Sequence, residues 1–350
     1  MKPFLKKTIQ GVLWGLAAIV LIGCAYLANL IYIRTPGSVD TLQFKGFVLL
    51  PKGASLTVLD YLTIHDQRLF VTDESAGSVY RLSLRGNELP RSEDIAAFTG
   101  EPATHGVALD LVQHVAFVSR SEVNVVDVFD PKTMKAIART PVSDDPDAIF
   151  YDDFAGMIYL ANGDAHVATL IDPKTHAVVA TIPLGGKPEF SVSDPQSHWR
   201  YQNLRDTNSV AAVDLVKRTV AGRWTLSGCV EPAGMAMDTE SRRLFIGCAG
   251  NSQLVVFDLT KQKVVATAPV GGNPDSVAFD AELHRIYTAG KAGVLTVVQQ
   301  HGPDAYAAVD SISLHYGAHT LAIDPATHNL YVGYASLLAR ARIAMFAPGR

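Results

Sequence analysis

Residues 272–299, GNPDSVAFDAELHRIYTAGKAGVLTVVQ, contain most of one repeating unit, and this unit decides the fold. A turn cluster at 272–275 precedes an apolar run that ends at Asp280, and three further short runs follow within 285–314. The runs are rich in β-branched and aromatic residues and are bounded by Gly, Pro, Asp or Asn, which predicts short strands joined by turns. No segment beyond the N-terminal region has a long 3.6-residue period, so the body of the chain is predicted to be all-β.

An apolar run that ends in aspartate occurs seven times along the chain. The closing residues are Asp60, Asp110, Asp152, Asp194, Asp238, Asp280 and Asp324. Successive closing residues are 50, 42, 42, 44, 42 and 44 positions apart. Strand-only repeats with a period in the low forties are typical of β-propellers, so we predict seven blades of four strands each. The longer first spacing predicts an insertion near residues 86–97.

We interpret the closing aspartates as turn residues whose side chains accept hydrogen bonds from nearby backbone N–H groups.

The last repeat predicts how the ring closes. Strands are expected at 320–324, 329–333 and 341–346, after which the chain ends before a fourth strand is complete. The strand-like segment 42–51 precedes the first repeat. We therefore predict that Gln43–Leu50 pairs beside Ala341–Phe346, because a blade built from both termini removes an exposed sheet edge.

The repeats resemble a known family. Residues 158–162 (IYLAN), 170–172 (LID) and 178–188 (VVATIPLGGKP) are similar to the YVTN-repeat (YncE-like) seven-bladed β-propellers, and the resemblance covers residues 40–350. It is weakest in the first blade and around residues 197–201. The resemblance implies binding functions rather than catalysis. Some relatives are reported to bind DNA, but this chain contains no basic run that would support that function.

The N-terminus predicts a membrane anchor. Lys2, Lys6 and Lys7 precede a charge-free, mostly apolar segment at 11–33, and Arg34 follows it. A helix of this length measures about 34 Å, enough to cross a hydrocarbon core of about 30 Å. The excess of lysine before the segment predicts that the N-terminus is cytoplasmic.

The predicted organisation is therefore a cytoplasmic basic segment at 1–10, a transmembrane anchor at 11–33, a linker at 34–41 and the propeller at 42–350. The expected location is a bacterial inner membrane, with a single crossing and the propeller on the periplasmic side. Two alternatives stay open for the same segment. One is a cleaved signal peptide. The other is a lipoprotein acylated at Cys24, because Leu21–Cys24 resembles a lipobox.

Charge and cysteines add two expectations about the exported part. The chain has 30 basic and 34 acidic residues, and without the three N-terminal lysines 27 basic residues face 34 acidic ones. A negatively charged body does not fit a general nucleic-acid binder. Cys229 and Cys248 flank the first two strands of the fifth repeat. Antiparallel pairing of these strands brings the two cysteines together, so we predict a disulfide in an oxidising compartment.

Chemistry-bearing residues form one column of the repeat. The chain has no phosphate-binding Gly-Lys-Ser/Thr loop, no His-Glu-x-x-His, no Gly-x-Ser-x-Gly and no Cys-x-x-Cys. Five positions before each closing aspartate, however, the residues are Ser55, His105, Asp147, Glu189, Ala233, Asp275 and His319. This column enters the innermost strand of each blade. It is expected to ring one mouth of the channel, where the polar side chains either bind a ligand or simply cap turns and hold water.

Two functions remain open from the sequence. The first is an anchored binding or scaffold module that holds a small molecule, a metal or an envelope protein at a mouth formed by His105, Asp147, Glu189, Asp275 and His319. A hard divalent cation is expected to use Asp147, Glu189 and Asp275, and zinc is expected to add the two histidines. The alternative is a metal-dependent hydrolase of lactone or ester type, in which the cation polarises a carbonyl.

Overall fold

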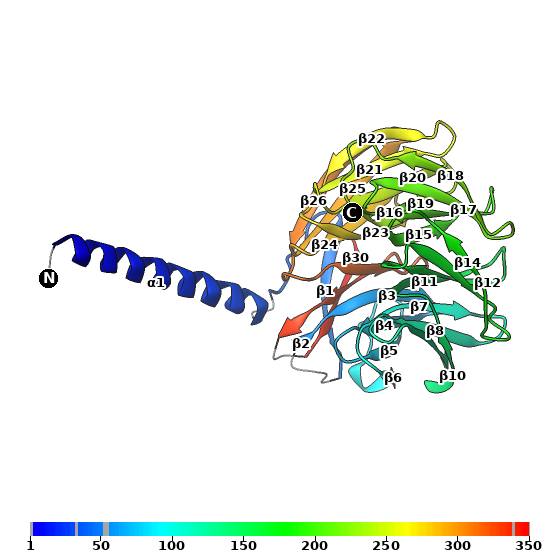
Figure 1. The fold of residues 1–350 in the computed structure, drawn as a ribbon, viewed down its shortest axis with the longest axis horizontal. Coiled ribbons are helices and arrows are strands. Elements are labelled where there is room, and N and C mark those ends of the chain that lie inside the picture. Colours follow the sequence, from blue (N-terminus) through cyan, green and yellow to red (C-terminus); the bar gives the residue numbers. More distant parts are fainter. Residues whose placement is uncertain (1–2, 32–33, 52–55, 338–339, 350) are drawn as a thin grey trace.

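A ring of β-sheets with one projecting helix forms the protein (Figure 1). The computed structural model describes residues 3–31, 34–51, 56–337 and 340–349. Seven four-stranded antiparallel sheets surround a central axis, which confirms the predicted seven-bladed β-propeller. The innermost strands of successive blades contact one another around the whole ring and enclose a central channel.

The first six blades each contain four strands that run outward from the channel in chain order. Blades one to three consist of β3 (Leu59–His65), β4 (Arg68–Asp73), β5 (Ser78–Ser83), β6 (Ala96–Thr99), β7 (Thr104–Asp110), β8 (Val115–Arg120), β9 (Val125–Asp130), β10 (Lys135–Pro141), β11 (Pro146–Asp152), β12 (Met157–Asn162), β13 (Val167–Ile171) and β14 (Val178–Pro183). Blades four to six consist of β15 (Pro188–Ser193), β16 (Trp199–Leu204), β17 (Ser209–Asp214), β18 (Thr219–Thr225), β19 (Pro232–Asp238), β20 (Arg243–Cys248), β21 (Gln253–Asp258), β22 (Lys263–Pro269), β23 (Pro274–Asp280), β24 (Arg285–Gly290), β25 (Val294–Gly302) and β26 (Ala305–Ser313). The predicted insertion is the long connection between β5 and β6, which contains the 3-10 helix η1 (Ser92–Asp94).

Blade seven closes the ring with both ends of the propeller. Its strands from the channel outward are β27 (Thr320–Ile323), β28 (Leu330–Tyr334), β30 (Arg342–Pro348) and β1 (Leu42–Leu49). The pairing of β1 with β30 runs from Leu42 opposite Pro348 to Leu49 opposite Arg342. The predicted closure is therefore confirmed. A short additional pair joins β2 (Leu56–Thr57) to β29 (Ser336–Leu337).

Six of the seven predicted closing aspartates act as turn residues. The carboxylate of Asp110 accepts hydrogen bonds from the backbone N–H groups of Val112 and Gln113, and Asp280 does the same for Glu282 and Leu283. These bonds satisfy backbone groups that the tight turns leave without a ladder partner. Asp60 is the exception, because it is the second residue of β3 and not the last.

The hydrophobic core lies between adjacent blades rather than inside one domain centre. For example, Phe117 and Val128 of blade two pack against Ile149 and Leu160 of blade three, and all four side chains are buried. Equivalent clusters lie between the other neighbouring blades. Each blade therefore depends on its neighbours to bury its two faces, as expected for a repeat protein.

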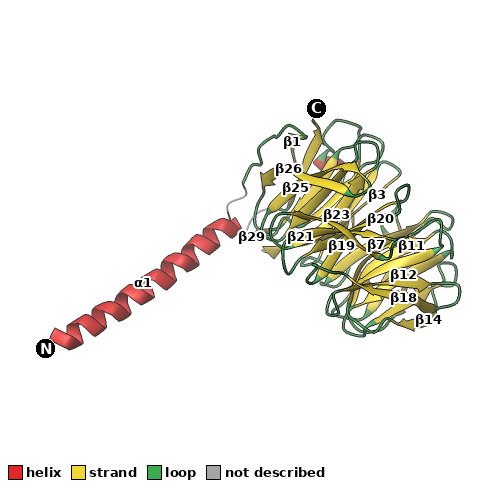
Figure 2. Cartoon of the chain, turned by 90° about the horizontal axis from the view of Figure 1, so that it is seen from above, coloured by secondary structure: helices red, strands yellow, loops and turns green. Residues whose placement is uncertain are grey.

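Helix α1 (Pro3–Ile31) extends away from the propeller (Figure 2). Its segment Gly11–Ala28 has a mean hydropathy of 2.2, is long and apolar enough to cross a membrane, and has no residue buried against the rest of the protein. Near its C-terminal end, the ring of Tyr26 lies edge-on to that of Tyr316, with centroids 6.0 Å apart. In blade five, Cys229 and Cys248 are joined by a disulfide with Cα atoms 5.2 Å apart.

Candidate functional site

In blades one to six, a recurrent bulge in the innermost strand directs one side chain of each blade toward the mouth of the channel. In blades one to five the pairing with the second strand shifts after the first residue, for example between Thr104 and Val107 in blade two. Blade six has a shift at the same place, between Pro274 and Ser276. A bulge leaves its extra residue unpaired and re-aims its side chain.

The residues at this bulge position form the ring of the mouth. They are Asp60, His105, Asp147, Glu189, Ala233 and Asp275, and His319 precedes β27 in blade seven. The ring therefore contains Asp60 in place of Ser55, which lies outside the described residues. The alignment of the repeats on their closing aspartates was wrong in blade one. The first strand of this blade ends at His65, and Asp60 is its second residue. The strand starts of blades one and two are 45 residues apart, not 50.

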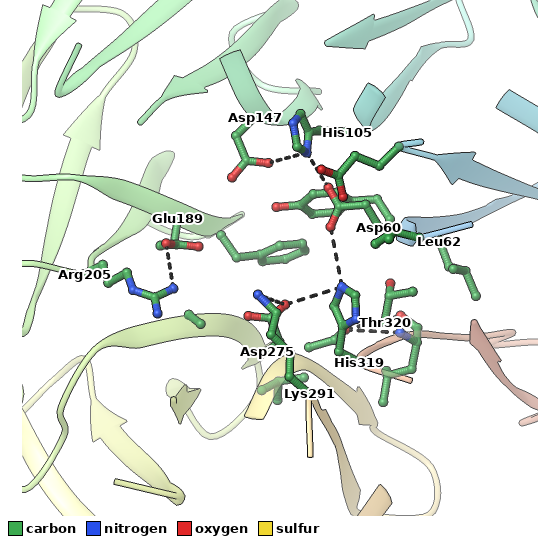
Figure 3. Close-up of a pocket in the computed structure, with 18 of the residues that line it drawn as sticks. Asp60, Leu62, His105, Asp147, Glu189, Arg205, Asp275, Lys291, His319 and Thr320 are labelled. Carbon is green, nitrogen blue, oxygen red and sulfur yellow. Dashed lines mark hydrogen bonds and ion pairs between the residues drawn. The ribbon is translucent and has the colours of Figure 1, made fainter. Parts of the chain in front are cut away.

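The mouth opens into a cavity of about 370 Å³. Figure 3 shows Asp60, His105 and Asp147 on one side of this cavity, and Glu189, Asp275 and His319 around the rest of it. The five predicted ligand-binding residues all line it. Besides Asp60, five charged residues that the column did not include line it as well, and these are Glu74, Asp145, Lys187, Arg205 and Lys291.

Asp60 lies between the two histidines. Its carboxylate is 2.6 Å from Nδ1 of His105 and 3.8 Å from Nε2 of His319. Burial alone raises the pKa of Asp60, but the hydrogen bond from His105 and the nearby charge of both imidazoles outweigh burial and hold the pKa below its usual value. Burial lowers the pKa of His105, but the bond to Asp60 and the charge of Asp147 raise it to about 9. Burial also lowers the pKa of His319, but its contact with Asp60 and the charge of Asp275 outweigh the effect of burial and raise the pKa.

Asp147 is the least satisfied carboxylate of the ring. Its nearest cationic group is Nδ1 of His105, at 3.7 Å, and no described residue donates a hydrogen bond to its side chain. Burial, partly offset by His105 and reinforced by the neighbouring carboxylates, raises the pKa of Asp147 to about 8. One ligand atom each from Asp60, His105 and Asp147 lie within 4.8 Å of one another, which is close enough to share a metal ion.

The opposite side of the cavity carries ion pairs. Glu189 is 3.1 Å from Arg205, and Asp275 is 3.2 Å from the ammonium group of Lys291. A further ion pair of the cavity lining joins Lys187 and Asp145, at 3.3 Å, and Asp145 lies two residues before Asp147. Two of the three carboxylates predicted as metal ligands, Glu189 and Asp275, therefore already have cationic partners. The structure groups Asp147 with Asp60 and His105 instead.

The second nitrogen of His105 contacts Ser121. Its Nε2 is 2.8 Å from the hydroxyl oxygen of Ser121, which lies in the turn between β8 and β9. No sequence pattern singles out Ser121, because it has no nucleophile motif and lies 16 residues from His105. A hydroxyl oxygen that accepts a hydrogen bond from Nε2–H fixes the ring and leaves Nδ1 directed at Asp60 and Asp147.

Aromatic side chains separate the mouth from the rest of the channel. Tyr61 and Phe190 stack with ring centroids 6.1 Å apart. Together with Leu62, they line both the 370 Å³ cavity and a second cavity of about 540 Å³. The channel is thus divided into a charged compartment at the mouth and a more apolar one beyond Tyr61 and Phe190. We call the second, of about 540 Å³, the lower cavity.

Comparison with known proteins identifies the fold and no narrower family. No family model and no curated protein sequence matches the chain. Among solved structures, the hydrazine synthase of Kuenenia stuttgartiensis aligns with a TM-score of 0.70 and 14% identity, over 83% of this chain and 96% of that one. The virginiamycin B lyase of Staphylococcus aureus aligns with a TM-score of 0.70 and 10% identity, over 87% and 99% of the two chains. At these identities the similarity shows the propeller fold alone.

Proposed function

We propose that this protein is a membrane-anchored binding propeller that holds a divalent cation at its channel mouth through Asp60, His105 and Asp147. One observation carries the proposal: three ligand atoms from three blades lie within 4.8 Å of one another, and one of them belongs to Asp147, to which no described residue donates a hydrogen bond. A cation would relieve the repulsion between the two carboxylates, which otherwise requires a bound proton.

The ligand set favours particular metals. Two carboxylates with one imidazole suit zinc or manganese, whereas calcium takes six to eight oxygen ligands. The hydroxyl oxygen of Ser121 would accept a hydrogen bond from Nε2–H of His105 and so orient the ligating ring. Arg205 and Lys291 line the same cavity. We infer that an anionic small molecule, bound through the cation and these two side chains, completes the site.

The test is calorimetric titration of the full chain in lipid nanodiscs with Zn²⁺ and with Mn²⁺, after treatment with a chelator. The double variant Asp60→Asn, Asp147→Asn is expected to lose at least about tenfold in affinity, because neutral amides replace both charged ligands. Asp153→Asn is the matched control, since this exposed aspartate lines the other end of the channel. Equal affinity in the double variant and the parent would remove the proposed site.

The anchored, extracytoplasmic placement and membership of the YVTN-repeat family are part of the same proposal. Helix α1 supports the anchor, and the disulfide between Cys229 and Cys248 supports an oxidising compartment. The repeats at 158–188 support the family. A reporter enzyme that is active only outside the cytoplasm, fused after Arg350, tests the placement, and an inactive fusion would contradict it.

The second candidate function is hydrolysis of a lactone or ester at the same mouth. The observation that favours it is the chain from Asp60 through His105 to Ser121, with contacts of 2.6 and 2.8 Å. Such an arrangement activates a hydroxyl as a nucleophile once the imidazole is neutral. Because the pKa of His105 is raised to about 9, this route requires alkaline pH.

A panel of lactones and esters separates two forms of this hydrolase. A metal-dependent enzyme loses activity with chelator. An enzyme that uses Ser121 keeps its activity with chelator and loses it in Ser121→Ala. No turnover under either condition leaves binding as the function of the mouth.

A further inference from the structure

The second strand of blade four contains a charged residue where every other blade has an apolar one. Arg200 occupies the strand position that pairs with the residue before the closing aspartate of the first strand. The equivalent residues in the other six blades are Leu69, Ala116, Ile158, Leu244, Ile286 and Leu330. All six are fully buried, and Arg200 is itself only 3% exposed. Because the other six blades fill this position with a buried apolar side chain, packing alone does not explain an arginine here.

The charge of Arg200 is poorly compensated. Its nearest carboxylate is that of Asp152, 3.8 Å from Nε, and Nε has no hydrogen-bond partner among the residues that the structure describes. Asp152 already accepts hydrogen bonds from the hydroxyl of Ser193 and the backbone N–H of Ala155. One guanidinium nitrogen makes a long contact of 3.4 Å to Ser191. A buried charge with such weak partners is destabilising unless something else binds it.

Aromatic rings hold the guanidinium in place. Its central carbon lies 4.6 Å from the ring centroid of Phe150 and 5.1 Å from that of Tyr159. These cation–π contacts fix the plane of the side chain and supply only part of the missing compensation. The guanidinium is therefore preorganised at one place in the wall of the channel.

Arg200 lines the lower cavity of about 540 Å³, on the far side of Tyr61 and Phe190 from the charged mouth. Most of the remaining lining is apolar or aromatic, and it includes Ile64, Val107, Leu109, Ile149, Phe150 and Val192. Asp153 is the only carboxylate among the lining residues that the structure describes, and it is exposed. An apolar cavity with one buried cation is typical of a site for a small molecule that has an apolar body and one anionic group.

We propose that this lower cavity binds a small monocarboxylate with an apolar body, and that Arg200 anchors the carboxylate. A guanidinium can donate two parallel hydrogen bonds to a carboxylate, which a lysine cannot reproduce. The proposal does not depend on the cation site at the mouth, since the two cavities share only the residues that separate them.

The experiment is titration calorimetry of the full chain in nanodiscs, with empty nanodiscs as the blank. The probes are 4-phenylbutyrate and hexanoate, and the uncharged analogue 4-phenylbutanamide is the ligand control. Saturable binding of at least one carboxylate is expected, with the amide at least about tenfold weaker, because it cannot form the charged pair. Absence of saturable binding for both carboxylates, or equal affinity for the amide, would overturn the proposal.

Variants of Arg200 test the anchor directly. Arg200→Leu introduces the residue type of the other blades, so it is expected to fold with an equal or higher melting temperature. It should bind the carboxylate at least about tenfold more weakly than the parent. The affinity of Arg200→Lys for the carboxylate should lie between that of Arg200→Leu and that of the parent. Unchanged affinity in Arg200→Leu would contradict the anchor. The mouth variant Asp60→Asn, Asp147→Asn should bind the carboxylate as the parent does, and loss of binding there would place the ligand at the mouth instead.

Discussion

At the scale of single residues, the carboxylate of Asp60 controls the protonation of the mouth. It lies against both His105 and His319, and it raises the pKa values of both imidazoles. Asp147, which has a raised pKa of about 8, holds a proton over the same pH range. Near neutral pH the mouth therefore binds protons that a divalent cation would have to displace, so cation affinity should rise with pH.

A pH-dependent stability follows from these shifts. The folded protein holds the proton of His105 up to about pH 9, whereas the unfolded chain releases it near pH 6.5. This stabilisation is complete below about pH 6.5 and is lost as the pH rises through 9, and the raised pKa of Asp147 acts in the same direction. We expect the urea midpoint of chelator-treated protein to fall between pH 6.5 and 9.5.

The same prediction has an internal control. Asp60→Asn should lower the pKa of His105 toward 6.5, visible in the NMR titration of its ring protons, and should reduce the pH dependence of the midpoint. His114→Gln, which removes an exposed histidine from a turn, should change neither quantity. A pKa of His105 that is the same in Asp60→Asn and the parent would contradict the assignment.

Residue-level reasoning predicted six of the seven ring positions, because residues that share a repeat position share a place around the axis. It missed Asp60, since Asp60 follows an apolar run and so mimics a closing aspartate. It missed Ser121 and Lys291 for a different reason. These residues lie in turns after the second strand, where no sequence pattern shows which side chain reaches the mouth.

At the scale of the structural element, the disulfide of blade five fixes the start of β19 to the end of β20. Cys229 and Cys248 are 19 residues apart, and both are buried in the cluster between blades four and five. Closing a loop of this size contributes about 3 kcal/mol in the chain-entropy description. We expect the variant Cys229→Ala, Cys248→Ala to lose about this much free energy of unfolding in a urea titration. Cys24→Ser is the control, because Cys24 is an exposed free thiol in α1.

Strand β1 carries the closure of the ring. Its residues pair with β30, and Val48 and Leu50 are buried in the cluster shared by blades seven and one. A chain that begins at residue 52 should lose cooperative thermal unfolding, since it exposes the edge of β30 and opens that cluster. A chain that begins at residue 35 retains β1 and should unfold in one cooperative transition. Identical transitions for the two chains would show that β1 is dispensable.

At the scale of the whole molecule, the propeller was predictable and the placement of its function was not. Turn residues and apolar runs recur at a fixed period, and each blade needs neighbours on both faces, so repeat number and ring closure follow from the sequence. Which side chains line each end of the channel, however, depends on how bulges and turns direct them. The places of Asp60 and Arg200 could be recognised only from the strand register, because the register shows which residues of different blades are equivalent.

The relation of the molecule to the membrane gives the last prediction. Helix α1 is uninterrupted from Pro3 to Ile31, so the apolar segment continues past Cys24 in one helix. A lipoprotein would begin at an acylated Cys24 and would retain only the last turns of this helix. They are too short to cross a hydrocarbon core of about 30 Å.

We therefore expect an uncleaved anchor. Mass spectrometry of protein extracted from membranes should find a peptide that contains Lys6 and Lys7, and washing with salt or alkaline buffer should not release the propeller from the membrane. A variant Cys24→Ser should stay membrane-bound to the same extent, because the anchor depends on the apolar helix and not on the thiol. A mature N-terminus at acylated Cys24, or release of the propeller in Cys24→Ser, would establish the lipoprotein instead. A propeller free in the periplasm would establish a cleaved signal peptide.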